Sequence, residues 1–254
     1  MTPLERINVI RKWILEYVET MDKPANCLVV GISGGVDSAV VSTICAMTGM
    51  KTLVASMPIS QRPEHHDLSI KHKNWITTKY SNCYGVEIDL THTFLSFENQ
   101  MVDMKFKDEM GLANSRARMR MMCLYQLSAS TSGIVVGTGN KIEDFGVGFY
   151  TKWGDGGVDI SPIADCTKTE VWAMAKELGI LEEIQIAEPT DGLWSDGRND
   201  TDQLGMSYSQ IEYLMKNPSE PEYQKYLKIR KKNLHKMKSI PVCKFDGKTN
   251  LANN

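Results

Sequence analysis

The sequence lacks any apolar run that is long enough to cross a membrane. A membrane-spanning helix needs about 18 or more consecutive apolar residues, and the most apolar stretches of the 254-residue chain, 27–32 and 134–136, have the length of a single strand. The N-terminus also lacks the continuous apolar segment of a secretory signal, because charged residues such as Arg6 and Arg11 interrupt it. We therefore expect a cytoplasmic protein that makes no contact with a membrane.

An excess of charge of one sign is missing as well. The 29 basic and 31 acidic side chains leave a formal net charge of -2, which creates no overall field that would attract a polyanion. Nucleic acid is therefore not expected as a partner.

Paired cysteines are also missing, because none of the six lies in a C-x-x-C motif, and Cys27 and Cys45 lie in apolar stretches. We expect reduced thiols in the core, not disulfides or zinc ligands.

Internal repeats and low-complexity linkers are absent too. Hydrophobic residues make up 42% and charged residues 24% of the chain, which are ordinary values for a globular protein and unlike those of disordered, collagen-like or coiled-coil chains. A chain of this length buries about three quarters of its unfolded surface. We expect residues 1–254 to form a single compact domain.

What the sequence does contain is an alternation of strand and helix patterns. Short apolar runs, typical of strands buried on both faces, are followed by segments with apolar residues at helical spacing. This alternation predicts an α/β fold with a mostly parallel sheet. Between 140 and 157 lies a glycine-rich stretch that is too long for an ordinary connection, and the last third of the chain holds short helices separated by prolines. Helices are predicted over 4–21, 36–47, 63–79, 114–131 and 168–178, and strands over 27–32, 51–57, 84–89 and 133–137.

Residues 31–38 read G-I-S-G-G-V-D-S and lie between the first predicted strand and a helix. Glycines let the backbone approach an anion closely, and free N–H groups at the start of a helix attract phosphate. The stretch lacks the lysine of a Walker loop, but Asp37 is placed to give an oxygen ligand to a magnesium ion that holds pyrophosphate. These features favour a phosphate-binding loop.

Two other interpretations of the same stretch stay open. Residues 31–35 satisfy G-x-S-x-G, the nucleophile elbow of serine hydrolases, and His235 follows several acidic residues late in the chain, in the order that such a hydrolase requires. The stretch is also compatible with a structural glycine turn before a helix. The short pattern alone does not choose between these three roles.

The longer string S-G-G-V-D-S, Ser33 to Ser38, resembles the loop of the N-type ATP pyrophosphatases, which cleave ATP between the α and β phosphates. The strand at 133–137 leads into V-V-G-T-G-N-K-I-E-D at 135–144 and then Y-T-K-W-G-D-G-G-V-D-I at 150–160. With K-T-E at 168–170 and P-T at 189–190, these motifs resemble the NAD synthetases of the ammonia-using form, over residues 4–240. Another amidating or thiolating member of the superfamily stays open as an alternative, although the missing C-x-x-C motif argues against most thiolating types.

The resemblance implies a doubly wound, mostly parallel sheet with helices on both faces. It also implies a ligase that uses ATP and Mg²⁺ to adenylate the carboxylate of nicotinic acid adenine dinucleotide (deamido-NAD), with release of pyrophosphate, after which ammonia displaces AMP to give NAD. Because both substrates are anions, cations must hold them together, and no covalent enzyme nucleophile is expected. The family forms homodimers. The 26 residues before the first strand cannot house a glutamine amidase domain, so free ammonia is the expected nitrogen donor.

The resemblance further implies roles for individual residues. Asp37 and Lys168 would be catalytic, and Asp37 and Glu143 would bind Mg²⁺. The set for deamido-NAD would be Arg118, Lys152, Asp159, His235 and Lys236. The ATP-binding set would be Gly31, Ile32, Ser33, Gly34, Gly35, Val36, Asp37, Ser38, Thr138, Lys168 and Thr190.

Several other residues are expected to have structural roles only. On a helix, Arg118 points away from Arg116 and Arg120, so at least one of these arginines is expected to be solvated or salt-bridged. The sequence departs from the family where the usual F-T-K-Y-G-D reads Y-T-K-W-G-D at 150–155, and the exchange of one aromatic residue for another should preserve stacking. We expect Met119, Met121 and Met122 to fill the core and His65, His66 and His72 to lie on the surface.

Overall fold

The computed structural model describes residues 1–60, 63–190, 199–243 and 245. Within them lies a parallel sheet of four strands in the order β3-β2-β1-β4. The chain moves outward from β1 to β2 and β3, and then returns to the other side of β1 to form β4, so that Leu28 lies opposite Thr52 on one side and Ile134 on the other. This reversal makes the sheet doubly wound, with a switch point between β1 and β4. The strands are β1 (Cys27–Gly31), β2 (Lys51–Ser56), β3 (Cys83–Glu87) and β4 (Gly133–Val135).

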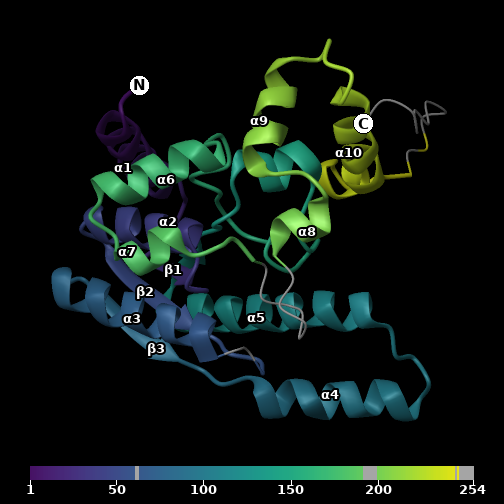
Figure 1. The fold of residues 1–254 in the computed structure, drawn as a ribbon. Coiled ribbons are helices and arrows are strands. Elements are labelled where there is room, and N and C mark those ends of the chain that lie inside the picture. The colour runs from purple at the N-terminus through teal and green to yellow at the C-terminus, as the bar shows by residue number, and fades with distance from the viewer. Residues whose placement is uncertain (61–62, 191–198, 244, 246–254) are drawn as a thin grey trace.

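Helices cover both faces of the sheet (Figure 1). Successive side chains of a strand point to opposite faces of the sheet. In β1, Leu28 and Val30 pack against one set of helices, whereas Cys27 and Val29 face the other set. Burial on both faces explains why the strand is a continuous apolar run. One face carries α1 (Pro3–Glu19), α2 (Val36–Met47), α3 (Pro63–Lys79) and α6 (Lys168–Glu177), and the other carries α4 (Thr91–Asp103) and α5 (Glu109–Thr131).

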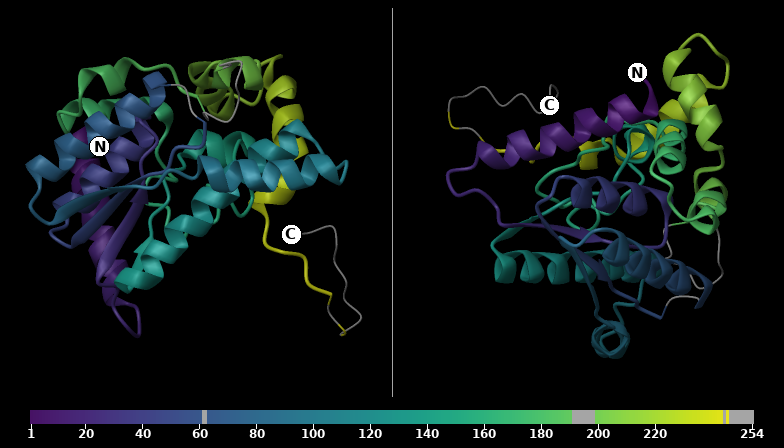
Figure 2. Two further views of the ribbon diagram at one scale, coloured as in Figure 1. Left: turned by 90° about the horizontal axis from the view of Figure 1, so that it is seen from below. Right: turned by 90° about the vertical axis from the view of Figure 1, so that its left-hand side faces the viewer.

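The C-terminal helices pack around the segment that follows β4. This segment forms a π-helix, η1 (Lys141–Val147), and α7 (Glu182–Ile186) and α8 (Asp200–Leu204) come later in the chain. The last two helices, α9 (Tyr208–Lys216) and α10 (Tyr223–Met237), lie together at one side of the molecule, where they share a small apolar core with η1 (Figure 2).

Helix α10 fixes the chain between η1 and residue 150 through a row of side-chain donors. Arg230 donates to the carbonyl oxygens of Phe145 and Gly146, and Asn233 Nδ2 donates to the carbonyl oxygen of Val147 at 3.0 Å. Three residues further along the helix, the Nζ of Lys236 donates to the carbonyl oxygen of residue 150 at 2.6 Å. The basic C-terminal helix therefore sets the path of the glycine-rich stretch.

All four predicted strands and all five predicted helices are present in the described residues. Helix α5 begins at Glu109, earlier than the predicted 114, and α4, in which Phe94 is the one buried residue, was not predicted. The glycine-rich stretch is partly helical, since η1 lies inside it. Four cysteines are buried free thiols, as expected: Cys27, Cys45, Cys83 and Cys166. The expectation of a core position is wrong for Cys123, which is half-buried, and for Cys243, which is exposed.

None of the helices in the described part of the chain is long and apolar enough to cross a lipid bilayer.

Candidate active site

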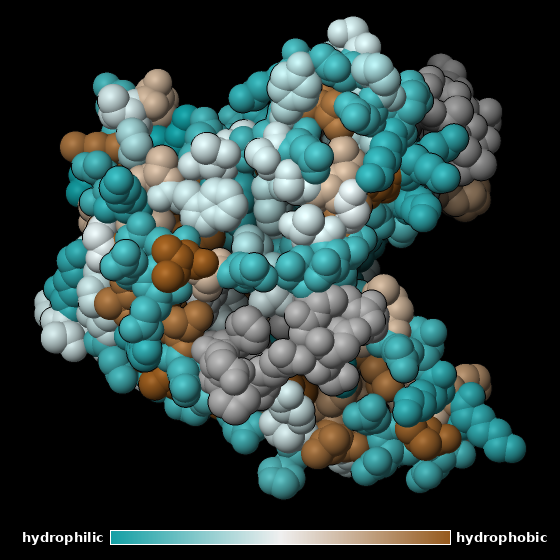
Figure 3. All heavy atoms as spheres, in the orientation of Figure 1, coloured by the Kyte–Doolittle hydropathy of each residue, from teal (hydrophilic) through white to brown (hydrophobic). Residues whose placement is uncertain are grey.

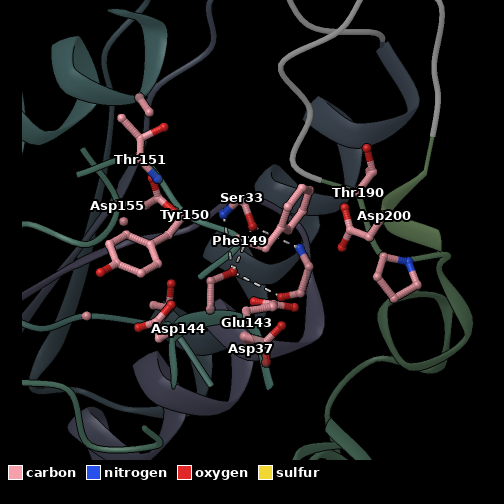
Figure 4. Close-up of a pocket in the computed structure, with 18 of the residues that line it drawn as sticks. Ser33, Asp37, Glu143, Asp144, Phe149, Tyr150, Thr151, Asp155, Thr190 and Asp200 are labelled. Atoms are coloured by element: carbon pink, nitrogen blue, oxygen red, sulfur yellow. Dashed lines mark hydrogen bonds between the residues drawn. The ribbon is translucent and has the colours of Figure 1, made fainter. Parts of the chain in front are cut away.

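A cavity of about 1130 Å³ opens at the carboxyl ends of β1 and β4. The loop after β1, residues 31–38, lines one side, and the segments that follow β4 line another. Figure 4 shows the carboxylates, hydroxyls and aromatic rings that surround it. In doubly wound sheets ligands bind at this position, where the strand order reverses.

The loop after β1 is braced by its own two serines. Ser38 Oγ accepts from Ser33 N at 3.2 Å and donates to Gly35 O at 3.0 Å, while Ser33 Oγ accepts from Gly35 N at 3.2 Å. Gly34 has a φ of 90°, in the left-handed region that suits glycine. Gly35 is the N-cap of α2 and brings no side chain to the first N–H groups of the helix. These groups therefore remain available to an anion.

Lys168 joins two carboxylates from distant parts of the chain. Its Nζ lies 2.6 Å from Asp37 Oδ2 and 2.8 Å from Glu143 Oε1, and its side chain is 3% exposed. Asn140 Nδ2 donates to Asp37 Oδ1 at 3.1 Å. Asp37 comes from the first turn of α2, Glu143 from η1 and Lys168 from the first residue of α6. The three groups meet because the loops after β1 and β4 face each other.

Burial and charge act in opposite directions on this group. Burial raises the pKa of Asp37, even though the Lys168 ammonium works against it. Burial opposes the ionisation of Glu143 as well, but there Lys168 and the hydrogen bonds outweigh it and lower the pKa. For Lys168 itself, the two carboxylates outweigh burial and raise the pKa above its ordinary value. At neutral pH the lysine is charged, so one positive charge faces two carboxyl groups.

The start of α6 is fixed from several sides, which positions Lys168. Thr167 and Glu170 form a capping box, with Thr167 N donating to Glu170 Oε2 at 2.8 Å. Arg6 of α1 contacts Glu170 Oε1 at 2.5 Å. A lysine in the first turn of a helix opposes the helix dipole, so the favourable partners of Lys168 are the two carboxylates of the cavity.

Two further carboxyl groups, Asp144 and Asp155, line the cavity near Glu143. Burial and the neighbouring carboxylates raise the pKa of Asp144 to about 8. The surrounding protein displaces water from Asp155 and raises its pKa to about 6. A Cβ atom on Gly139 would lie 2.0 Å from Asp144 Oδ2, so the second glycine of the G-T-G-N motif is what admits this carboxyl group.

Cations and an aromatic ring line the part of the cavity next to α5. Arg118 Nε donates to the carbonyl oxygen of Lys152 at 3.2 Å, and Lys152 Nζ lies 5.3 Å from the centre of the Trp153 ring. Trp153 is exposed and has a φ of 66°, a left-handed conformation that costs a non-glycine residue about 1 kcal/mol or more. An exposed aromatic ring held in this way beside two cations suits the binding of a flat, negatively charged ligand.

The structure brings all but one of the predicted site residues to this cavity. Asp159 is not part of the lining; its Oδ1 accepts from Tyr125 Oη at 2.9 Å and its Oδ2 from Val135 N at 2.8 Å, so it joins α5 to β4. Its role towards substrate stays a prediction. The lining includes Gly31, Ile32, Ser33, Gly34, Gly35, Val36, Asp37, Ser38, Arg118, Thr138, Glu143, Lys152, Lys168, Thr190, His235 and Lys236.

Sequence reasoning missed five residues at or beside the cavity. Arg120, Asp144, Asp155 and Asp200 line it, and the buried Tyr208 contacts Glu143. Asp144 and Asp155 lay inside the quoted motifs without an assigned role, so the motifs contained the signal for them. No spacing in the sequence marks Asp200 and Tyr208, because they reach Glu143 only through the packing of the C-terminal helices against η1.

The serine hydrolase interpretation is not supported by the geometry. Ser33 Oγ contacts Ser38 Oγ and Gly35 N, and no histidine of the described residues forms a hydrogen bond with it. The histidine that does contact a serine is His72, whose Nε2 lies 2.8 Å from Ser42 Oγ, and neither residue lines the cavity. His72 is 1% exposed, so the expectation that it lies on the surface is wrong. The side chain of His65 lies outside the described part of the structure.

The chemistry of Asp37 and Glu143 fits a magnesium ion. Mg²⁺ prefers oxygen ligands and is usually bound by one or two carboxylates, with water and substrate phosphates completing its shell. No group of three or more histidine, cysteine, aspartate or glutamate side chains that could hold a metal occurs among the described residues. Two carboxylates beside a phosphate loop therefore suit a metal that arrives with a nucleotide, not one held by protein alone.

Comparison with known proteins points to one family. The family model of NAD synthase matches residues 6–249. The NH(3)-dependent NAD(+) synthetase of Carboxydothermus hydrogenoformans is 36% identical over 240 residues, which cover 93% of this chain and 96% of that protein. Among solved structures, the NMN synthetase of Francisella tularensis superposes with a TM-score of 0.86 at 27% identity, covering 96% of this chain and 100% of that chain. The NH3-dependent NAD synthetase of Campylobacter jejuni superposes with a TM-score of 0.75 at 22% identity, with the same coverage.

Proposed function

Because the chain belongs to the NAD synthase family, we propose that it catalyses the ATP-dependent amidation of deamido-NAD with ammonia, giving NAD, AMP and pyrophosphate. The protein is then a ligase that forms a C–N bond in the last step of NAD biosynthesis. One observation carries the proposal: a single cavity holds the phosphate loop 33–38, the paired carboxylates of Asp37 and Glu143, and the cations Arg118 and Lys152. A ligase that adenylates a carboxylate needs these three parts together.

The first step joins two anions. The carboxylate oxygen of the nicotinate attacks the α-phosphorus of ATP, an O–P bond forms, and pyrophosphate leaves with the electrons of the bond that breaks. The N-terminus of α2 and its loop bind the phosphates, while Arg118 and Lys152 hold the acid in line. Lys168 lies between Asp37 and Glu143 and stays protonated, so we assign to it the stabilisation of the charge that develops on the leaving pyrophosphate.

The metal is a part of this proposal. Asp37 and Glu143 would hold Mg²⁺, which supplies positive charge to the phosphate oxygens when it is bound. Thr138 and Thr190 line the cavity beside this pair and are assigned to the nucleotide. Asn140 keeps Asp37 oriented through its hydrogen bond to Oδ1.

The second step needs neutral ammonia, so the ammonium ion must first lose a proton. Asp155 lines the cavity, and we assign to its carboxylate the acceptance of a proton from ammonium. Ammonia then attacks the acyl carbon, the C–N bond forms, the C–O bond to AMP breaks, and the excess proton is released. The names of the relatives support ammonia as the donor, and no step calls for a covalent bond to the enzyme.

A second function is supported by one specific observation. The NMN synthetase of Francisella tularensis is similar to nearly the whole of this chain and matches it more closely in structure than the NAD synthetase reported above. The same chemistry applied to nicotinic acid mononucleotide gives nicotinamide mononucleotide. The two functions differ only in whether the acid carries an adenylate half.

The experiment that tests the function compares the two acids directly. The purified protein is incubated with ATP, MgCl₂, NH₄Cl and either deamido-NAD or nicotinic acid mononucleotide, and the products are separated by chromatography. We expect amide, AMP and pyrophosphate in equal amounts, with the higher kcat/KM for deamido-NAD. A higher kcat/KM for the mononucleotide assigns the second function instead, and no amide from either acid contradicts both. Glutamine in place of NH₄Cl should support no turnover.

We also propose that the protein acts as a homodimer through α4, the connection that follows it, and α5. Phe94 is the one buried residue of α4. Several apolar side chains at the end of α4 and in the segment that follows it are exposed. Brown side chains gather at the lower right of Figure 3, where α4 and the start of α5 lie. Met122 was expected in the core, yet it is 63% exposed on α5. A second copy would cover this apolar surface, which consists of Val102, Met104, Phe106, Met110, Met122 and Tyr125.

A further inference from the structure

A buried tyrosine connects the carboxylate of Glu143 to the C-terminal helices. Tyr208 is the first residue of α9, and its Oη lies 2.6 Å from Glu143 Oε1 and 2.6 Å from Asp200 Oδ2. Burial and the two carboxylates raise the pKa of Tyr208 above its usual range, so the phenol is neutral. A neutral phenol carries one hydrogen and donates it to one of these oxygens at a time.

Two donors meet on the same carboxylate oxygen of Glu143. Lys168 Nζ and Tyr208 Oη both bond Oε1, and the lysine ammonium also lies 4.7 Å from the centre of the tyrosine ring. Neither of these two donors uses Oε2. Two hydrogen bonds to Oε1 fix the orientation of the carboxylate.

Asp200 extends the connection towards the nucleotide side of the cavity. Its side chain contacts the phenol, and its backbone N–H donates to the carbonyl oxygen of Pro189 at 3.1 Å. Pro189 precedes Thr190 in the cavity lining, and Figure 4 shows Asp200 beside Thr190. The phenol ring is itself fixed by an edge-on contact with Trp172 of α6, at 6.4 Å between ring centres. One chain of contacts therefore runs from Glu143 to the residue next to Thr190.

We propose that Tyr208 is a positioning residue for the divalent cation: its hydroxyl orients Glu143 and, through Asp200, sets the spacing between this carboxylate and the segment that carries Thr190. This rests on the proposed function, because it requires that Asp37 and Glu143 bind a metal that arrives with ATP. Hydrogen-bond partners of metal-binding carboxylates typically change metal affinity by about 10- to 100-fold. Tyr208 belongs to this class of residue, since it touches the ligand Glu143 and does not line the cavity.

The test measures metal binding without turnover. Binding of Mn²⁺ to the full chain is followed by electron paramagnetic resonance in the presence of an α,β-methylene analogue of ATP, which cannot be cleaved at that bond. Tyr208→Phe removes the hydroxyl and keeps the ring against Trp172 and Lys168. Tyr213→Phe is the matched control, because Tyr213 lies on the same helix, is exposed, and donates to Glu220 at 2.7 Å.

We expect Tyr208→Phe to weaken Mn²⁺ binding by about 10-fold or more, to raise the Mg²⁺ concentration needed for half-maximal activity, and to leave the KM for the acid substrate within about twofold of wild type. Tyr213→Phe should match wild type in all three. Asp200→Ala leaves the phenol hydrogen to Glu143 alone and serves as a second variant. It should weaken Mn²⁺ binding less than Tyr208→Phe does, because the contact between the phenol and Glu143 remains, and it should add little to Tyr208→Phe in the double variant.

Unchanged Mn²⁺ binding in a folded Tyr208→Phe variant overturns the positioning role and leaves the proposed function standing. Equal weakening in Tyr213→Phe also overturns it, because the effect would then belong to the helix and not to the contact with Glu143. Failure of the wild-type protein to bind Mn²⁺ with the ATP analogue removes the metal site itself, and the positioning role with it.

Discussion

The ammonium of Lys168 lies 2.6 Å from the carboxylate of Asp37, although 131 positions separate the two residues in the sequence. The same ammonium contacts Glu143 at 2.8 Å. One positive charge between two carboxylates leaves negative charge next to the loop 31–38, to which we assign the binding of the ATP phosphates. A divalent cation that arrives with ATP can neutralise this charge, which connects the geometry of the cavity to the first step of the reaction.

Asp37→Asn should abolish adenylation and leave the fold intact. The variant keeps the size of the side chain and loses the charged oxygen, so we expect pyrophosphate release to fall by at least about 100-fold. The rate is measured with a coupled pyrophosphate assay, and the melting temperature reports on the fold. Asp165→Asn is the control, because Asp165 is exposed and forms an ion pair with Lys141 outside the cavity. Wild-type pyrophosphate release by Asp37→Asn would refute the metal role of this residue.

Lys168→Met should destabilise the protein, because it leaves two carboxylates facing each other with no cation between them. Removal of one partner of a buried ion pair typically costs about 3 to 5 kcal/mol, and we expect a loss near the lower end in urea unfolding, since Asp37 and Glu143 are only partly buried. Adding Asp37→Asn to the variant should restore part of the loss. Lys141→Met, which breaks an exposed pair, should cost less than about 1 kcal/mol.

If Lys168→Met is as stable as wild type, or if Asp37→Asn gives no recovery in that background, the ammonium does not hold the two carboxylates together.

Lys152→Ala should weaken binding of the acid substrate and leave the affinity for ATP nearly unchanged. Loss of a desolvated charge pair with the ligand corresponds to about 2 to 4 kcal/mol, which is about 30-fold or more in KM. Steady-state kinetics with the acid and ATP varied in turn separate the two effects. An equal rise in both KM values would indicate that Lys152 supports the cavity as a whole and does not bind the acid.

His72 should make the protein less stable in mild acid. Burial lowers its pKa to about 4, whereas the unfolded chain has a histidine pKa of about 6.5. Below pH 6.5 the unfolded state therefore binds a proton that the folded state does not bind, and the free energy of unfolding falls as the pH drops towards 4. At pH 5 the loss from this group is about 2 kcal/mol.

The measurement is urea unfolding at pH 7.5 and pH 5.0 for wild type and His72→Gln, whose amide can still reach Ser42. The difference between the two pH values should be smaller by about 2 kcal/mol in the variant. His92→Gln, at an exposed position near the start of α4, should keep the wild-type difference. Identical losses in wild type and His72→Gln would show that other groups cause the acid sensitivity.

Phe106→Asp should convert the proposed homodimer into monomers. Phe106 is 71% exposed and lies in the connection between α4 and α5, and a charge there would oppose the burial of apolar surface between two copies. Sedimentation of wild type and variant gives the mass in solution. Phe245→Asp, at another exposed phenylalanine, is the control and should leave the mass unchanged. A wild-type monomer would remove the proposed interface.

The strands, and the loop from Ser33 to Ser38, could be predicted because their signals are local. A run such as 27–32 is apolar throughout, since β1 is buried on both faces, and glycines followed by Asp37 mark the start of α2. The resemblance to the NAD synthetases placed Lys168 and Glu143 at the same site, where the structure brings them within hydrogen-bond distance of each other.

The remaining features depend on packing between distant segments. Tyr208 contacts Glu143, and Asp200 contacts Tyr208, only because α9 packs on η1, and no local pattern in the sequence predicts these contacts. His72 was expected on the surface because it shows no metal-ligand spacing with any cysteine, but α3 places it against α2, where Ser42 is its partner. Lys236 was expected to bind substrate; it lines the cavity, and its ammonium also supports the carbonyl oxygen of Tyr150.

The most direct test of adenylation followed by amidation is the fate of oxygen-18 in the carboxylate of the acid substrate. Deamido-NAD with oxygen-18 in its carboxylate is converted with ATP, MgCl₂ and NH₄Cl, and the masses of the products are measured by mass spectrometry. We expect one labelled oxygen in AMP and none in pyrophosphate, because the carboxylate oxygen that attacks the α-phosphorus leaves with AMP. Unlabelled AMP, or ADP with labelled phosphate, would contradict cleavage of ATP at the loop from Ser33 to Ser38.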